Sequence, residues 1–158
     1  MGEALRSASS PDGRWHASVD ADGRLFLRGG AADRRLPGVR CGTHTVDALD
    51  GSPARERRRV DPDDLCFSPD GRHLVALSRY TFDCEYYYGG GYTELRARVW
   101  LVTLDDSQPP RCIHGVSGSI EHYSRQELPP AVVRVSFPED GGIGLHLSSG
   151  EMIHWAPE

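Results

Sequence analysis

A chain of 158 residues has the size of one ordinary domain, which can bury a core without the support of disulfides or metals. Its formal net charge of -5 argues against a nucleic-acid partner, because proteins of that class concentrate positive charge to displace counterions. All 18 basic residues are arginine, so Schiff-base and P-loop chemistry, which need lysine, are excluded.

The N-terminal residues MGEALRSASS have neither the basic start nor the apolar core of a secretory signal. No apolar run approaches the roughly 18 residues of a membrane span. We therefore expect a cytoplasmic protein of bacterial type with no membrane partner. The four cysteines are widely spaced without a C-x-x-C pair, which favours free thiols and predicts no metal cofactor: Cys41, Cys66, Cys84 and Cys112.

Strand patterns dominate the chain, whereas no window keeps apolar residues at helical spacing for three turns. In chain order the expected strands are 14–20, 24–29, 72–78, 94–104, 131–137, 142–148 and 151–156. The segment RHLVALS is almost continuously apolar, and RWHASVD alternates. This pattern predicts a single all-β domain over residues 1–158.

A reverse turn of one kind recurs between these strands. Ser-Pro-Asp-Gly-Arg occurs at residues 10–14 and again at 68–72, and Pro-Glu-Asp-Gly at 138–141 is a variant with one inserted residue. Proline presets the first corner of such a turn, aspartate can bond its own backbone, and glycine accepts the left-handed conformation. The chain is thus expected to reverse three times in the same way.

The cadence of strand, Ser-Pro-Asp-Gly-Arg turn, strand, short turn and third strand resembles the blades of β-propellers of the WD40 and TolB-like type. Residues 68–72 followed by Val99-Trp100 carry the resemblance best, whereas the Gly-His and Trp-Asp signatures of strict WD40 repeats are absent. The resemblance implies an antiparallel meander of three propeller-like repeats, at about residues 5–42, 60–115 and 130–158.

Three blades cannot close a ring, because propellers use typically four to eight. Two arrangements follow: an open meander whose loops cover its edges, or a six-bladed ring completed by dimerisation. Long loops are expected at residues 42–64, at 80–94, where they interrupt the middle repeat, and at 105–130, with a short strand near Ile113.

The segment FDCEYYYGGGY is the strongest candidate for a binding surface. Tyrosine supplies a large, stiff contact area with one hydroxyl, and glycine lets a loop adapt, as in many recognition loops. The alternative is a hairpin tip whose rings pack back onto the sheet. The predicted partner-binding residues are Tyr86, Tyr87, Tyr88, Tyr92, Asp83 and Glu85.

Catalytic signals are weaker. The seven histidines form no H-x-H or H-E-x-x-H pattern, although His146 and His154 fall in neighbouring strands. The sequence GVSGS lacks the last glycine of a nucleophile elbow, and the carboxylates at 61–64, 105–106 and 139–140 lie where turns need them.

These observations favour a non-catalytic module that binds another protein, such as a toxin-neutralising immunity protein or an accessory factor. Two rival hypotheses remain. One is a hydrolase or metal-dependent enzyme that uses loop histidines and carboxylates, and the other is a self-assembling half-propeller.

Overall fold

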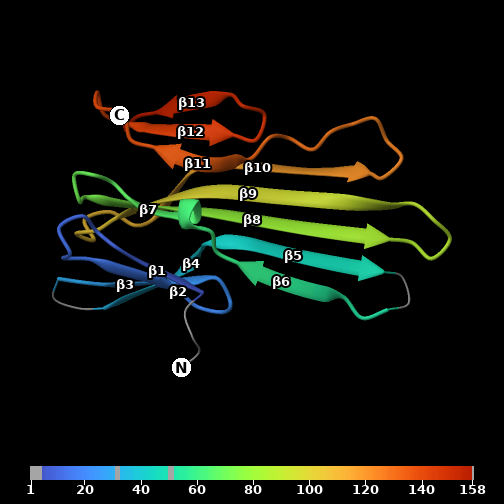
Figure 1. Ribbon diagram of the computed structural model, residues 1–158, viewed down its shortest axis with the longest axis horizontal. Helices are drawn as coiled ribbons and strands as arrows, with labels where there is room; N and C mark the ends of the chain where they lie inside the picture. The colour runs from blue at the N-terminus through green and yellow to red at the C-terminus, as the bar shows by residue number, and fades with distance from the viewer. Residues whose placement is uncertain (1–4, 31–32, 50–51, 158) are drawn as a thin grey trace.

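The computed structural model describes residues 5–30, 33–49 and 52–157, so the ends of the predicted domain at 1–4 and 158 lie outside the described residues. These residues form an all-β structure of three sheets (Figure 1). Sheet 1 contains, in spatial order, β1 (Arg6–Ser9), β2 (His16–Val19), β3 (Arg24–Arg28) and β4 (Arg34–Arg40).

Sheet 2 is the largest and has the order β10-β9-β8-β5-β6, with β7 also paired to β8. Its strands are β5 (Gly42–Leu49), β6 (Arg55–Arg59), β7 (Leu65–Phe67), β8 (His73–Glu85), β9 (Gly91–Thr103) and β10 (Arg111–Glu121). A single 3-10 turn, η1 (Pro62–Asp64), precedes β7. Sheet 3 contains β11 (Val132–Ser136), β12 (Ile143–Leu147) and β13 (Met152–Trp155). No helix among the described residues has the length and apolar character needed to cross a membrane.

Two of the three repeated turns have the same hydrogen bonds. The hydroxyl of Ser10 donates to Asp12, whose carboxylate accepts the backbone N–H of Arg14 at 3.0 Å. Ser68 and Asp70 repeat both contacts, the second again at 3.0 Å. The third turn, which has proline in place of this serine, is closed by the N–H of Gly141 on the carbonyl of Pro138.

Sheet 2 is the middle layer where β8 begins, because successive side chains of a strand point to opposite faces. Leu74 and Ala76 belong to the core shared with sheet 1, whereas Val75 and Leu77 belong to the core shared with sheet 3. Both faces of this segment are therefore buried. This double burial explains why RHLVALS shows no polar alternation.

The outer faces of sheets 1 and 3 are polar. Sheet 1 presents serines and arginines beside Phe26, over which the Arg35 guanidinium lies at 5.7 Å. Sheet 3 presents Arg134, His146 and His154, with the exposed Met152 beside them, on its outer face. Polar outer faces are typical of the end repeats of an open stack, and a six-bladed ring would have to bury them. The three sheets are accordingly open.

The other end of sheet 2 extends beyond both neighbouring sheets (Figure 1). The two cores include no described residue of β8 after Leu77 and none of β9 before Val99. We call this extension, with Gly42–Leu49, Arg55–Arg59, 78–85, 91–98 and 114–121, the half-sheet.

The half-sheet corrects several expectations. Residues 42–64 contain β5, β6 and η1 instead of one long loop, and β10 fills 11 residues where a short strand was expected. Of the expected insertion at 80–94, only residues 86–90 lie outside strands. Pairing of β5 with β8 is also parallel, which departs from a purely antiparallel meander.

Gly42 makes this parallel pairing possible. The chain leaves sheet 1 at β4 and enters sheet 2 at β5 with a φ of 97° at Gly42, a conformation that disfavours side chains. A Cβ at this position would also lie 2.5 Å from the carbonyl oxygen of Arg59. Only glycine fits the corner at which the chain changes sheets.

Candidate binding site at the tip of the β8–β9 hairpin

Four of the predicted tyrosines gather where β8 turns into β9. The N–H of Tyr86 donates to the carbonyl of Gly90 at 2.9 Å, and the N–H of Gly89 donates to that of Tyr86 at 3.0 Å. Gly91 has a φ of 154°, and a Cβ there would lie 2.0 Å from the carbonyl oxygen of Cys84. The glycine run is therefore needed to close the turn that displays the rings.

The rings form a continuous contact series along this turn. Tyr86 and Tyr88 stack with centroids 5.4 Å apart, Tyr86 and Tyr92 lie 6.2 Å apart, and Phe82 lies 5.8 Å from Tyr92. Such aromatic pairs add stability beyond the area they bury and fix one another's orientation. Partial desolvation raises the pKa of Tyr86 and Tyr92, so both phenols are neutral near pH 7.

The outermost rings face solvent. Tyr87 is 87% exposed and Tyr88 is 83% exposed. The predicted alternative, in which all the rings pack back onto the sheet, is therefore wrong for these two residues. It holds for Tyr86 and Tyr92, which are half-buried.

The structure adds Tyr123 to this cluster. This residue is 87% exposed, and its ring would lie 3.6 Å from a Cβ built on Gly90. It belongs to the segment after β10, 31 positions after Tyr92 along the printed sequence. A lone tyrosine in a polar segment carries no signal of its own, so sequence reasoning missed it. We call Tyr86, Tyr87, Tyr88, Tyr92 and Tyr123 the tyrosine tip.

Asp83, whose side chain is 40% exposed, lies on the face of the hairpin opposite Phe82 and Tyr92. Its carboxylate lies 2.8 Å from Nε2 of His122 and accepts a hydrogen bond from the Thr93 hydroxyl at 2.9 Å. These contacts tie the segment after β10 to the hairpin, immediately before Tyr123. Asp83 thus positions a ring that it does not touch, whereas Glu85 is exposed at the end of β8.

The residues considered for catalysis do not converge among the described parts of the chain. No three histidine, cysteine or carboxylate side chains lie close enough there to hold a metal ion. Nε2 of His146 lies 2.8 Å from the Ser136 hydroxyl, and Nε2 of His154 lies 3.1 Å from the carbonyl of Gly141. The Cys112 thiol donates to the backbone carbonyl of His114 at 3.2 Å.

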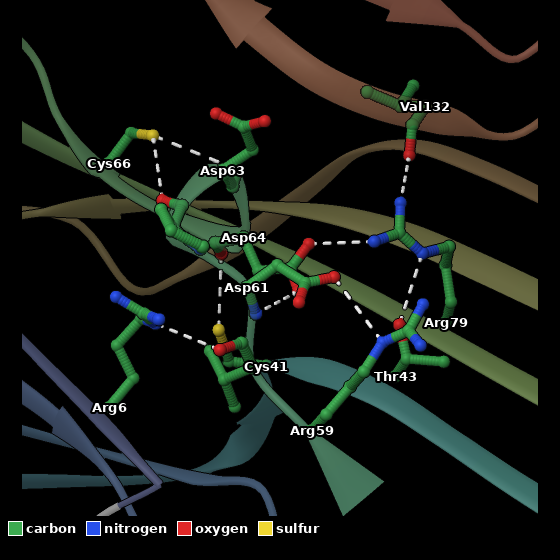
Figure 2. A network of polar contacts seen from close by, with 12 residues as sticks. Arg6, Cys41, Thr43, Arg59, Asp61, Asp63, Asp64, Cys66, Arg79 and Val132 are labelled. Atoms are coloured by element: carbon green, nitrogen blue, oxygen red, sulfur yellow. Dashed lines mark hydrogen bonds and ion pairs between the residues drawn. The ribbon is translucent and has the colours of Figure 1, made fainter.

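A buried ion pair joins Asp64 to Arg79 (Figure 2). Asp64, expected to be a turn carboxylate, is fully buried and accepts a hydrogen bond from Arg79 at 2.8 Å. Its other oxygen accepts the N–H of Asp61 at 2.9 Å. Among the described residues, every buried side-chain nitrogen or oxygen has a hydrogen-bond partner.

The same network joins the three sheets. Arg79 of β8 donates to the carbonyl of Val132 in β11 at 3.0 Å, and Cys41, beside sheet 1, donates its thiol to the carbonyl of Asp64 at 3.2 Å. Burial raises the pKa of the Cys41 thiol far above its usual range, which keeps it protonated and unreactive. The cluster is therefore a structural junction whose buried side-chain nitrogen and oxygen atoms all have hydrogen-bond partners.

The chain matches no protein-family model, and no curated protein matches it significantly.

Proposed function

We propose that this protein is a non-catalytic module that binds another protein through the tyrosine tip. The observation that carries the proposal is the exposure of Tyr87, Tyr88 and Tyr123, at 87%, 83% and 87%, on one end of the half-sheet. Single exposed aromatic residues are common on protein surfaces, but these three large rings come from two chain segments and form a group. Grouped exposed rings of this kind mark interaction sites.

The chemistry of these rings suits recognition. Tyrosine buries a large area when a partner covers it, loses little side-chain entropy, and keeps a hydroxyl for one directional hydrogen bond. Tyrosine is also among the residues that dominate the binding energy of protein interfaces. The turn between β8 and β9, which carries the rings, lies at the end of the half-sheet that extends beyond sheets 1 and 3 (Figure 1).

Support for the rings is rigid. Tyr86 stacks on Tyr88 and donates its N–H to the carbonyl of Gly90, and Tyr92 is paired within β9. Tyr123 is held by the contact between His122 and Asp83. Preorganised side chains lose less entropy when they bind. Blocking a toxin, as an immunity protein does, needs only such a surface and no catalytic group.

Site-specific crosslinking in the source organism tests the proposal. A photoreactive phenylalanine analogue replaces Tyr87 in one sample and the exposed Met152 of β13 in a matched control. We expect one protein to crosslink at position 87 and not at position 152, and we expect Tyr88→Ala with Tyr123→Ala to abolish that product. A product that is equal at both positions, or that survives the double substitution, would show that the tip is not the binding surface.

A further inference from the structure

One face of the half-sheet is covered by sheet 1 at its base, where Arg58 donates to the carbonyl of Asp22 at 2.8 Å, and it is open nearer the tip. We call it the Tyr80 face, because it carries the side chains of Tyr80, Phe82 and Tyr92. The opposite face is partly covered, since Arg79 bonds the carbonyl of Val132 and Pro129 packs on Gly118. Both cores end before the half-sheet begins, so neither sheet 1 nor sheet 3 supplies an apolar layer for the Tyr80 face.

Two adjacent rows of side chains cross this face from β6 to β9. The row nearer the tip, the acidic row, consists of Glu56, Val46, Phe82 and Glu94. The next row, the basic row, consists of Arg58, His44, Tyr80 and Arg96. Directly paired residues of neighbouring strands point to the same face, so the register itself places each row on one side of the sheet.

The two rows have the same layout with opposite charge. Each has a charged residue at both ends and an apolar or aromatic pair in the middle. Side-chain contacts confirm that these residues share a face. Nε2 of His44 lies 3.1 Å from Oε1 of Glu56, and the ring centroids of His44 and Tyr80 lie 5.3 Å apart. A two-fold axis that lies between the rows and runs across the strands would therefore superpose each row on its opposite.

We propose that the Tyr80 face binds the Tyr80 face of a second copy of this chain about such an axis. This isologous packing places Glu94 against Arg96 of the second copy, and Glu56 against Arg58 of the second copy. In the centre it places Phe82 against Tyr80 of the second copy. The two-fold axis repeats each of these contacts, so the charges of one Tyr80 face are complementary to those of an identical face.

The β9 charges are the ones free to make this contact. The side chains of Glu94 and Arg96 have no recorded ion pair or hydrogen bond within the described parts of the chain, and Arg96 is exposed. Glu56 and Arg58 are already engaged, with His44 and with the carbonyl of Asp22 respectively. The pair on β9 is therefore the one that substitution should test.

The size of the face sets the expected affinity. The eight residues of β5 extend about 26 Å and five strands cover about 19 Å, so the face has roughly 500 Å² per copy. Two copies would bury about 1,000 Å², which is near the lower limit for specific association. The dimer is accordingly expected to be weak and to depend on protein concentration.

Sedimentation of the full chain over a range of concentrations tests the pairing. We expect the wild type to dimerise as concentration rises, and Arg96→Glu to weaken dimerisation at least tenfold by placing two carboxylates together. Glu94→Arg combined with Arg96→Glu should restore the wild-type constant, because it exchanges the charges and keeps them complementary. Arg28→Glu, on the exposed outer face of sheet 1, makes the same charge change away from the half-sheet and should have no effect.

A wild type that stays monomeric at every concentration, or a charge exchange that fails to restore association, overturns the pairing. Equal effects of Arg96→Glu and Arg28→Glu would also overturn it, because net charge alone would then control association. If the wild type is monomeric and the Tyr80 face instead captures a different macromolecule, the second copy is the wrong occupant. The proposal does not use Tyr87, Tyr88 or Tyr123, so their replacement by alanine is expected to leave the dimer unchanged.

Discussion

Arg79 of β8 holds the buried carboxylate of Asp64 at 2.8 Å and, through its other terminal nitrogen, the backbone of Val132 at 3.0 Å. A guanidinium can serve both partners because its donors are fixed in one plane. These two bonds connect the turn before β7, the long strand β8 and the first strand of sheet 3 (Figure 2). The position of sheet 3 thus depends on a polar contact as well as on its apolar core.

Replacing Asp64 with alanine should be severely destabilising. It leaves the mostly buried Arg79 charge without its carboxylate partner, and breaking one side of a buried ion pair costs about 3–5 kcal/mol. For a chain of this size the melting temperature should fall by about 10 °C. Asp63→Ala, at an exposed position of the same turn, is the matched control and should change it little. Comparable melting temperatures for the two variants would contradict the assigned role of the pair.

The hydrogen bonds of the turn at Ser68 should make the free energy of unfolding depend on pH. Hydrogen bonds from the Ser68 hydroxyl, and then from the N–H of Arg72, lower the pKa of Asp70 below its usual 3.8. The ionised carboxylate therefore stabilises the folded state above that value, and this contribution is lost as pH falls through the lowered pKa. Ser68→Ala should raise the Asp70 pKa measured by NMR and cost about 1 kcal/mol near neutral pH.

The difference in unfolding free energy between the wild type and Ser68→Ala should narrow in acid, because protonated Asp70 no longer benefits from these donors. Ser149→Ala removes an exposed serine that accepts only a weak bond from the N–H of Glu151 at 3.4 Å, and it provides the comparison. A gap that widens as pH falls would mean that Ser68 does not act through the ionised carboxylate.

Local patterning was sufficient to predict the core of the fold. The strands expected at 14–20, 24–29, 72–78 and 94–104 all overlap observed strands, because their alternating or continuous apolar residues do pack in the two cores. Of these, β8 and β9 extend beyond the expected ranges, to Glu85 and from Gly91. The strands expected near the C-terminus are also present as β11, β12 and β13. In each case burial against a neighbouring sheet produced the pattern that the sequence displays.

The strand segments of the half-sheet were not predictable in the same way. Their residues belong to neither core, so burial against a neighbouring sheet imposes no apolar pattern on the sequence. All five residues of β6 are exposed, so RERRR has the composition of a solvated loop. Gly118 in β10 allows Pro129 to pack closely against the strand. In the sequence, however, such a glycine indicates a turn. Parallel pairing of β5 with β8 joins segments more than 30 residues apart, and no local pattern encodes it.

In the candidate site, too, residues that are adjacent in sequence were predicted, and a residue brought in by strand pairing was not. Tyr86, Tyr87, Tyr88 and Tyr92 are adjacent in sequence and were found together, whereas Tyr123 reaches them only through the return of the chain along β10. Asp83 lies in the same hairpin, but strand alternation directs it to the face opposite Phe82 and Tyr92.

Gly91→Ala should open the tip while leaving the two cores intact. A Cβ at this position would lie 2.0 Å from the backbone oxygen of Cys84, which the surrounding strand pair cannot avoid without separating. Gly89→Ala is the matched variant: it also imposes a side chain at positive φ, which costs about 1–2 kcal/mol, but no atom lies within 4 Å of the added carbon.

Hydrogen exchange distinguishes the two glycine variants. The N–H of Tyr86, bonded to Gly90, should exchange much faster in Gly91→Ala than in Gly89→Ala, and amides of Leu74 and Leu77 should stay protected in both. Equal exchange at Tyr86 in the two variants would show that the close approach to Cys84 does not constrain the turn.

His122→Ala should weaken partner binding even though His122 is not among the tip rings. The imidazole contacts Asp83 at 2.8 Å and Thr93 at 3.1 Å, so His122→Ala removes these side-chain contacts between the segment that carries Tyr123 and the hairpin. The backbone bond from the N–H of His122 to the carbonyl of Gly91, at 3.0 Å, remains. An exposed side-chain contact of this kind contributes at most about 1 kcal/mol, so affinity for the crosslinked partner should fall by no more than about fivefold.

Combining substitutions separates positioning from direct contact. If His122 acts only by placing Tyr123, then His122→Ala should weaken binding in the wild-type background and have no further effect once Tyr123 is alanine. Losses that add in the double variant would assign His122 a contact of its own with the partner. The melting temperature should change little in either variant, because neither side chain belongs to the two cores.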